Sequence, residues 1–304
     1  MNIIFGPVNS RRFGKSLGID LSPSKKQCNF DCLYCELDPA KTIEIYEDVI
    51  SVQEIIEALT LSLKTDQDID AITVTANGEP TLYPYLSELL DEIEKIKGSI
   101  KTLILSNGSR ISDLKVQEAL MKFDTVKLSL DCATNRCLKR LDRSHENISV
   151  EDIKQGMLSF REKFNNPLII EVLIVKSIND KKEEIEALNE FLLTLNPTRI
   201  DIGTIDRPPA YNVEALSYEE LRAISLQFDT SLPIYIASRK KVTKKPSAYS
   251  NGEILQTLKK RPLTQEDIDV LFDTESKDRL NILIEEQRVK AVYNAEYDFF
   301  VCSE

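Results

Sequence analysis

Three cysteines near the amino terminus could hold a metal centre. They are Cys28, Cys32 and Cys35, in the run Cys-Asn-Phe-Asp-Cys-Leu-Tyr-Cys. Cysteine thiolates are the usual ligands of iron–sulfur clusters, and four of them saturate a cluster of four irons. Three thiolates within eight residues would therefore leave one iron able to bind a small molecule.

Two other interpretations of this spacing stay open. Structural zinc takes four ligands, but His145 is the one histidine of the chain, and the remaining cysteines, Cys132, Cys137 and Cys302, form no C-x2-C pair. The three cysteines could also be ordinary reduced thiols. A disulfide framework is disfavoured, because three cysteines so close together pair poorly. We interpret Cys132 and Cys137 as packed or surface thiols.

The elements that must position these cysteines follow an α/β pattern. Six short apolar runs are rich in Ile, Val, Leu and Thr, as in strands buried on both faces, and helical patterns lie between them. This alternation predicts a parallel sheet, either doubly wound or curled toward a barrel. The expected strands are 17–21, 71–76, 101–106, 125–130, 168–176 and 199–205, and the helices 52–63, 85–97, 113–122, 150–163 and 182–195.

The pattern changes after about residue 238. A basic stretch at 238–248 is interpreted as a linker, and helical patterns at 252–260, 264–272 and 275–286 precede an alternating stretch at 289–301. Three helices followed by a hairpin are the plan of a winged helix-turn-helix. We therefore expect a core domain at 1–237 and a winged-helix-like domain at 249–304. The third helix is acidic, which disfavours DNA as its partner and favours contact with a protein or peptide, or a role as a lid on the core domain.

The composition is that of a globular protein. The 304 residues are 42% hydrophobic and 29% charged, with a net charge of −11. Residues 238–304 hold 12 basic and 12 acidic groups, so the first 237 carry the whole net charge. This balance disfavours a surface coated with nucleic acid. With no signal peptide, no apolar stretch of membrane-spanning length and reduced cysteines, we expect a cytoplasmic protein without membrane contact.

Polar loops follow most of the expected strands. Ligands of parallel α/β sheets bind at the carboxyl ends of the strands, where such loops converge. The cysteine run follows the first strand, and the later loops begin with Asn77-Gly78-Glu79-Pro80, Ser106-Asn107-Gly108, Ser129-Leu130-Asp131 and Asp206-Arg207-Pro208-Pro209. Five polar loops at one edge of a sheet predict a binding site.

This combination resembles the radical S-adenosylmethionine (radical SAM) superfamily over about residues 1–210. In that family three cysteines hold a 4Fe-4S cluster, and the amino and carboxylate groups of SAM chelate its fourth iron. The resemblance implies a partial (β/α)6 barrel with Cys28, Cys32 and Cys35 as ligands. It also implies an external one-electron donor of the flavodoxin or ferredoxin type, and a 5′-deoxyadenosyl radical that abstracts hydrogen from a substrate.

The resemblance also assigns the contacts of SAM. The Gly-Gly-Glu motif of the family corresponds to Asn77-Gly78-Glu79, so Glu79 would contact the methionyl ammonium and the Gly78 backbone would frame it. Tyr34 would lie against the adenine. The ribose and carboxylate would be faced by Ser106, Asn107, Ser129 and Asp131.

A narrower resemblance points to the subgroup of the tRNA wyosine-forming synthetases. Residues 5–12 and Arg207-Pro208-Pro209 carry it, although those synthetases use further cysteines and are basic enough to hold tRNA, which this chain is not. The substrate therefore stays open among peptide, small molecule and RNA. The alternatives are a tRNA- or nucleotide-modifying enzyme, a peptide-modifying enzyme, and a non-enzymatic iron–sulfur or zinc regulator with a winged helix.

Overall fold

The computed structural model describes most of the chain. The described residues are 3–10, 14–65, 68–237, 246, 248–260, 263–294 and 297–303. The expected linker at 238–248 lies almost wholly outside them, and so do Arg11 and Arg12 of the amino-terminal stretch. Within these ranges, no helix combines the length and the apolar character that crossing a membrane requires.

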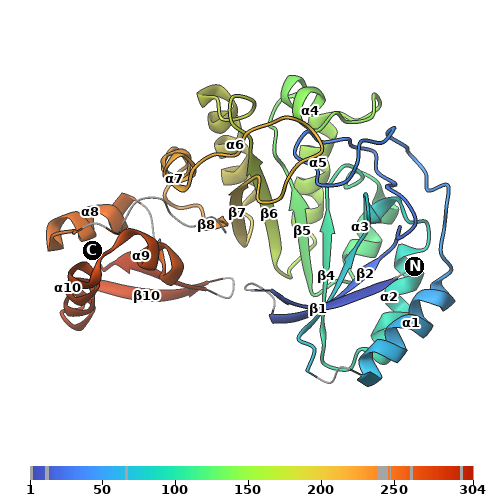
Figure 1. The fold of residues 1–304 in the computed structure, drawn as a ribbon, viewed down its shortest axis with the longest axis horizontal. Coiled ribbons are helices and arrows are strands. Elements are labelled where there is room, and N and C mark those ends of the chain that lie inside the picture. Colours follow the sequence, from blue (N-terminus) through green and yellow to red (C-terminus); the bar gives the residue numbers. More distant parts are fainter. Residues whose placement is uncertain are drawn as a thin grey trace.

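An eight-stranded sheet forms the larger part of the molecule (Figure 1), and its strands follow one another in chain order. A hairpin pairs β1 (Ile4–Ser10) with β2 (Gly14–Asp20) in antiparallel fashion, and each later pair is parallel. Sequential order without reversal excludes the doubly wound alternative and gives a sheet curled toward a barrel. The parallel strands are β2, β3 (Ala71–Thr75), β4 (Lys101–Ser106), β5 (Thr125–Ser129), β6 (Leu168–Ile174), β7 (Arg199–Thr204) and β8 (Ile234–Ala237).

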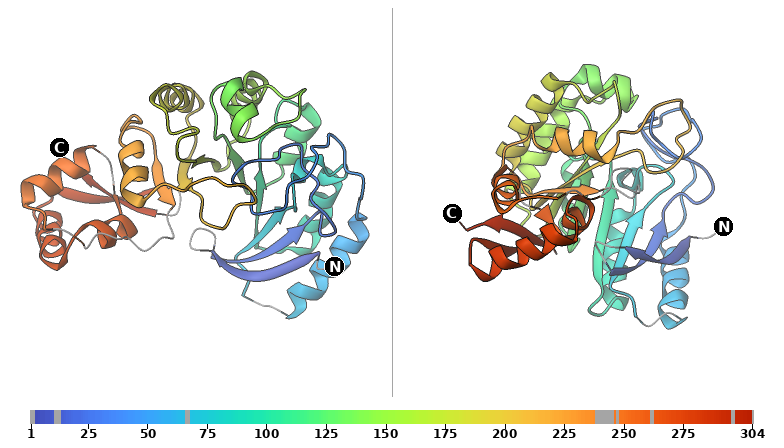
Figure 2. Two further views of the ribbon diagram at one scale, coloured as in Figure 1. Left: turned by 45° about the horizontal axis from the view of Figure 1, so that its top comes forward. Right: turned by 60° about the vertical axis from the view of Figure 1, so that its left-hand side comes forward.

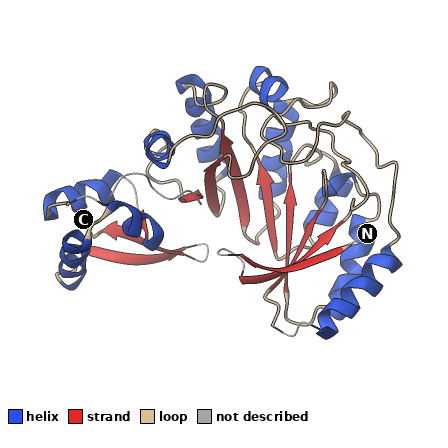
Figure 3. Ribbon diagram, in the orientation of Figure 1, coloured by secondary structure: helices blue, strands red, loops and turns tan. Residues whose placement is uncertain are grey.

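Helices cover one face of this sheet (Figure 3), because right-handed crossovers in a constant direction place every helix on the same side. In β5, Val126 and Leu128 are buried toward the helices, while Lys127 and Ser129 point to the opposite, concave face. Ser149 caps the helix that begins at Val150, because its side chain accepts a hydrogen bond from the amide of Asp152. The helices are α1 (Val52–Thr65), α2 (Leu86–Ile96), α3 (Leu114–Leu120), α4 (Asn135–Leu141), α5 (Val150–Arg161), α6 (Lys182–Leu195) and α7 (Tyr218–Ser225).

The carboxyl-terminal part forms a second core. Its helices are α8 (Asn251–Lys260), α9 (Gln265–Leu271) and α10 (Thr274–Glu285), and its three-stranded sheet has the order β10 (Val289–Asn294), β11 (Tyr297–Cys302), β9 (Leu263–Thr264). Ile254, Phe272 and Leu283 are fully buried in this core. The three expected helices and the hairpin are confirmed, whereas β9 was not predicted. Figure 2 shows this part beside the edge of the large sheet that β8 forms.

Two irregular segments lie over the carboxyl ends of the parallel strands (Figure 1). The first is the cysteine loop, residues 21–51, and the second is the strap, residues 205–217, which connects β7 to α7. The two lie side by side, because the amide of Ala210 donates to the carbonyl of Cys35 at 2.8 Å. Together they cover the carboxyl ends of the strands, where the sequence predicts a binding site.

Candidate functional site

A cavity of about 210 Å³ opens at this edge of the sheet. The residues of its wall come from the cysteine loop and from the ends of β3, β4, β5 and β6. Nine of the ten predicted site residues line it, namely Cys28, Cys32, Tyr34, Cys35, Gly78, Glu79, Ser106, Asn107 and Ser129. Asp131 lies behind the wall, in an adjoining space of about 10 Å³.

Gly78 lets the cysteine loop approach the end of β3. The amide of Gln27 donates to the carbonyl of Asn77 at 2.8 Å, and the amide of Glu79 donates to the carbonyl of Gln27 at 2.9 Å. Gly78 has φ +143°, and a Cβ at this position would stand 1.8 Å from the carbonyl oxygen of Gln27. No side chain fits there, and left-handed geometry favours glycine as well. The loop therefore reaches the cavity through a contact that requires this glycine.

The three thiols suit metal ligation. All three are unpaired cysteines that remain partly accessible through the cavity. Burial raises the pKa of Cys28 to about 12, with a further contribution from the Glu79 carboxylate, and burial also raises the pKa of Cys32. Such thiols hold their protons unless a cation takes the protons' place, which is what a bound metal does. Asn107 Nδ2 lies 3.7 Å from Cys28 Sγ and adds a donor to the sulfur.

Glu79 presents its carboxylate to the cavity in a fixed orientation. The side chain is 1% exposed. Its Oε1 accepts hydrogen bonds from the Thr81 amide, the Thr81 hydroxyl and the Ser106 hydroxyl, at 2.6 to 2.9 Å. Its Oε2 accepts from the Asn107 amide at 2.7 Å. Burial raises the pKa of this carboxyl against those hydrogen bonds. A carboxylate oxygen can accept more than one hydrogen bond, so Oε2 suits a cationic ligand group.

Asp131 orients Tyr34 from behind the cavity wall. The Tyr34 hydroxyl donates to Asp131 Oδ2 at 2.5 Å, and the Leu173 amide donates to Oδ1 at 2.7 Å. Burial raises the pKa of the Asp131 carboxyl. The expected direct contact of Asp131 with a ligand is therefore not visible in this geometry, whereas Ser129, two residues earlier, does reach the cavity.

The cavity wall also contains three further charged residues, Lys26, Lys127 and Glu171. Lys127 Nζ lies 2.5 Å from Glu171 Oε1 and 3.1 Å from Asp201 Oδ2, so a row of charges crosses β5, β6 and β7. Glu171 also lines the cavity, on the concave side of the sheet. Sequence reasoning missed Lys26 and Lys127; the signal for Lys127 was a charged residue inside an otherwise apolar strand.

The strap is fastened to the cysteine loop by side chains as well as by backbone. Arg207 forms two hydrogen bonds with the Glu36 carboxylate, at 2.6 and 2.7 Å. The Tyr211 hydroxyl donates to Asp31, and the Arg143 guanidinium lies 4.7 Å from the centre of the Tyr211 ring. These contacts hold the strap over the third cysteine.

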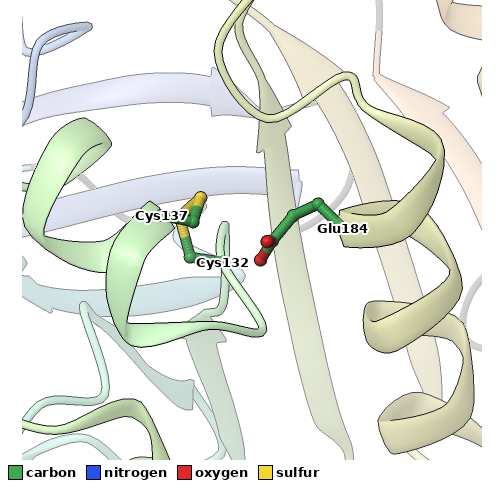
Figure 4. Close-up of side chains that lie close together, drawn as sticks. All are labelled: Cys132, Cys137 and Glu184. Atoms are coloured by element: carbon green, nitrogen blue, oxygen red, sulfur yellow. A yellow bond between two sulfur atoms is a disulfide. The ribbon is translucent and has the colours of Figure 1, made fainter.

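Cys132 and Cys137 are paired in a disulfide (Figure 4), so the expectation of two separate thiols is wrong in this structure. Glu184 points toward them, and the three residues could in principle gather around a metal ion. Its carboxylate, however, already accepts hydrogen bonds from the Ala133 amide and from the amide and hydroxyl of Thr134. With both sulfurs bonded to each other and the carboxylate satisfied, this group supplies no second metal centre.

Comparison with known proteins identifies the class. The model of the radical SAM superfamily matches residues 23–192, more than half of the chain. The chain therefore belongs to the radical SAM superfamily. A protein described as UPF0026 from Helicobacter pylori (strain ATCC 700392 / 26695) is 41% identical over 304 residues, which cover 98% of this chain and 97% of that protein.

Two further similarities are more distant. A GTP 3′,8-cyclase of Campylobacter jejuni is 26% identical over 183 residues, 59% of this chain and 53% of the cyclase. The structure of Streptococcus suis SuiB bound to S-adenosylmethionine is similar with a TM-score of 0.55 at 19% identity, over 73% of this chain and 51% of SuiB. The chain thus spans about half the length of each. The likeness to SuiB concerns the fold.

Membership in the superfamily defines the cofactors. The protein is an SAM-dependent enzyme that uses a 4Fe-4S cluster and SAM. The interpretation as a non-enzymatic zinc or iron–sulfur regulator is therefore wrong. The cluster was predicted from the cysteine run, and the enzyme class and SAM were predicted from the resemblance to the radical SAM superfamily; these predictions are confirmed.

Proposed function

We propose that Cys28, Cys32 and Cys35 hold the cluster and that SAM occupies the cavity beside it. The observation that carries this proposal is that three thiols and the Glu79 carboxylate line one cavity at the carboxyl ends of the parallel strands. When bound, the cluster would pass one electron from the external donor to the sulfonium of SAM. That reduction would cleave SAM into methionine and the 5′-deoxyadenosyl radical, which would abstract a hydrogen atom from the substrate.

The chain's own residues orient SAM and exclude water. Oε2 of Glu79 accepts the methionyl ammonium, and Gly78 allows the backbone to approach it. Tyr34, held by Asp131, packs against the adenine. The ribose and carboxylate meet polar groups from the ends of β4 and β5, which are Ser106, Asn107 and Ser129, with Asp131 behind them. The strap is hydrogen-bonded to the cysteine loop at Cys35.

The proposed substrate is a polar molecule. Lys127, Glu171 and Ser129 give the inner wall of the cavity charge and hydrogen-bonding groups, which suits polar rather than purely apolar molecules. A nucleotide or RNA and a peptide both meet this criterion, as do polar small molecules. The wyosine-like subgroup remains part of the proposal, supported by residues 5–12 and the Arg207–Pro209 stretch of the strap.

The remaining assignments concern the whole protein. The barrel occupies 1–237, a linker 238–248, and a winged-helix-like domain 249–304; three helices, a hairpin and a separate core support the last of these. An external donor of the flavodoxin or ferredoxin type delivers the electron. Cytoplasmic localisation fits this scheme, because the cluster ligands must stay reduced.

One anaerobic experiment tests the proposal. The full chain is reconstituted with iron and sulfide, SAM and dithionite are added, and 5′-deoxyadenosine is measured. Wild-type protein should form it, and Cys32→Ala should lose both the cluster and the product. Cys302→Ser is the matched control, since Cys302 lies in the second core, where its Sγ contacts the Leu255 carbonyl. Product formation by Cys32→Ala at the control's rate would refute the ligand assignment.

A second measurement identifies the substrate class. Extract is separated into tRNA, protein and small-molecule fractions, and each is added to the reconstituted enzyme. The fraction that accelerates 5′-deoxyadenosine formation contains the substrate. Acceleration by none of the fractions, with an intact cluster, would contradict a hydrogen-abstracting role.

A further inference from the structure

Lys26 shares a cavity wall with the three thiols. Lys26 lines the same cavity as Cys28, Cys32 and Cys35, and its side chain is 9% exposed. Its Nζ is 3.0 Å from Asp31 Oδ1. A lysine so little exposed is held by the structure, and water screens its charge only weakly.

Asp31 is fixed in its turn by three parts of the chain. The Ala40 amide donates to Oδ1 at 3.3 Å from the cysteine loop itself, and the Tyr211 hydroxyl donates to Oδ2 from the strap. Arg143, after α4, places a guanidinium nitrogen 3.5 Å from the same oxygen. Because its partner is anchored on these sides, the Lys26 ammonium has a defined position rather than a range of rotamers.

Of this ion pair, the lysine faces the cavity. Lys26 is part of the cavity wall, whereas Asp31 is not. The positively charged member of the pair is therefore the one that shares the cavity wall with the three thiols.

We infer that Lys26 is a positioning residue whose fixed positive charge raises the reduction potential of the cluster. This inference rests on the proposed ligand assignment. The reduced cluster carries one more negative charge than the oxidised one, so a nearby cation stabilises the reduced state more. Charge and hydrogen bonding around an iron–sulfur cluster are established determinants of its potential. Lys26 thus eases electron entry from the external donor.

The neighbouring Lys25 provides a matched control. It lies one residue away in the same loop, and it pairs with Glu47 at 2.7 Å, but its side chain is 46% exposed and is not part of the cavity wall. Water screens such an exposed ion pair. Removing either lysine changes the net charge equally, and only Lys26 should affect the cluster.

The test is a potentiometric titration of the reconstituted full chain without SAM, followed by electron paramagnetic resonance of the reduced cluster. At a fixed potential, Lys26→Met should lower the ratio of reduced to oxidised cluster about tenfold, which is ~59 mV for one electron. Lys26→Arg should stay close to wild type, because it keeps the charge. Lys25→Met should leave the midpoint unchanged.

Two results would overturn the inference: a Lys26→Met midpoint equal to that of wild type, or a Lys26→Arg midpoint as low as that of Lys26→Met. If Lys26→Met assembles no cluster, Asp31→Asn decides instead. That variant removes the counter-charge, so the potential should rise, and an unchanged or lower potential would refute the role of the pair. A wild-type chain that assembles no cluster would refute the ligand assignment itself, which distinguishes the two failures.

Discussion

Glu79 shows how a single residue of this site is prepared before any ligand arrives. Three donors converge on one of its carboxylate oxygens and one donor on the other. Burial disfavours the charge and the hydrogen bonds favour it, and burial has the larger effect on the pKa. A cation at Oε2 would remove the remaining cost of burying the charge, which is the physical reason to expect an ammonium group there.

Glu79→Gln should weaken SAM binding while leaving the cluster in place. The amide loses the negative charge, and its NH2 group would face donors such as the Asn107 amide. Loss of a hydrogen bond to a charged group costs about 1.5–3 kcal/mol, so the Kd for SAM should rise at least about tenfold. Anaerobic calorimetry with iron quantification measures both properties. Glu88→Gln, on the exposed face of α2, is the control, and equal affinities would contradict the assignment.

At this scale the sequence predicted the residues that belong to a motif and missed those that do not. The cysteines and Glu79 follow strand ends in a recognisable order, so their convergence could be expected. Lys26 lies just before the motif, and its place in the cavity depends on an ion pair with Asp31 that the strap completes from about 180 residues later. Contacts between distant segments leave no local pattern.

Among the elements, the turn after β3 determines how closely the cysteine loop can approach. Gly78 and Gly98 both have positive φ, at +143° and +59°. A methyl group added to Gly78 would meet the Gln27 backbone, whereas one added to Gly98 would meet no atom within 4 Å. An added methyl group would therefore be crowded at Gly78 and not at Gly98, although both positions have positive φ.

Gly78→Ala should destabilise the protein more than Gly98→Ala. Positive φ costs a non-glycine residue about 1–2 kcal/mol at Gly98, and it costs no less at Gly78, whose φ of +143° lies beyond the left-handed helical region. Forcing atoms into a packed site adds roughly 1–3 kcal/mol at Gly78 alone. Urea unfolding gives both free energies. Gly78→Ala should also lose affinity for SAM, because the shift moves Glu79. Equal free energies of unfolding for the two variants would show that the loop accommodates the methyl group.

The strands and long helices were predictable because each carries its own signal. The bounds of β4 were predicted as observed, and α6 likewise, since apolar periodicity marks both. β1, β8, α4 and α7 were missed. The strand β8 has four residues and the two helices have seven and eight, too few for periodicity to stand out. The hairpin partner β1 depends on pairing with β2, which is a tertiary property.

Across the whole molecule, two hydrophobic cores meet at a buried polar contact. The Tyr218 hydroxyl on α7 donates to Asp267 Oδ1 on α9 at 2.8 Å. Asp267 also accepts from the amide and hydroxyl of Thr264, forming the capping box that begins α9. Leu271 packs against both cores. The Asp267 carboxylate thus both caps α9 and connects the start of this helix to α7 of the barrel.

Tyr218→Phe should loosen this junction in a pH-dependent way. Burial raises the pKa of Asp267 in the folded protein, and the Tyr218 hydrogen bond opposes that rise. A raised folded pKa means that the group's contribution to stability is present at low pH and is lost as the pH rises through that value. Removing the hydroxyl raises the folded pKa further. The variant should therefore lose about 1–3 kcal/mol at pH 7.5 and less at pH 5, and the amides of α9 should exchange hydrogen faster. Tyr85→Phe, whose side chain is half exposed on the barrel, should change neither property; if Tyr218→Phe behaves like it at both pH values, the contact does not hold the two parts together.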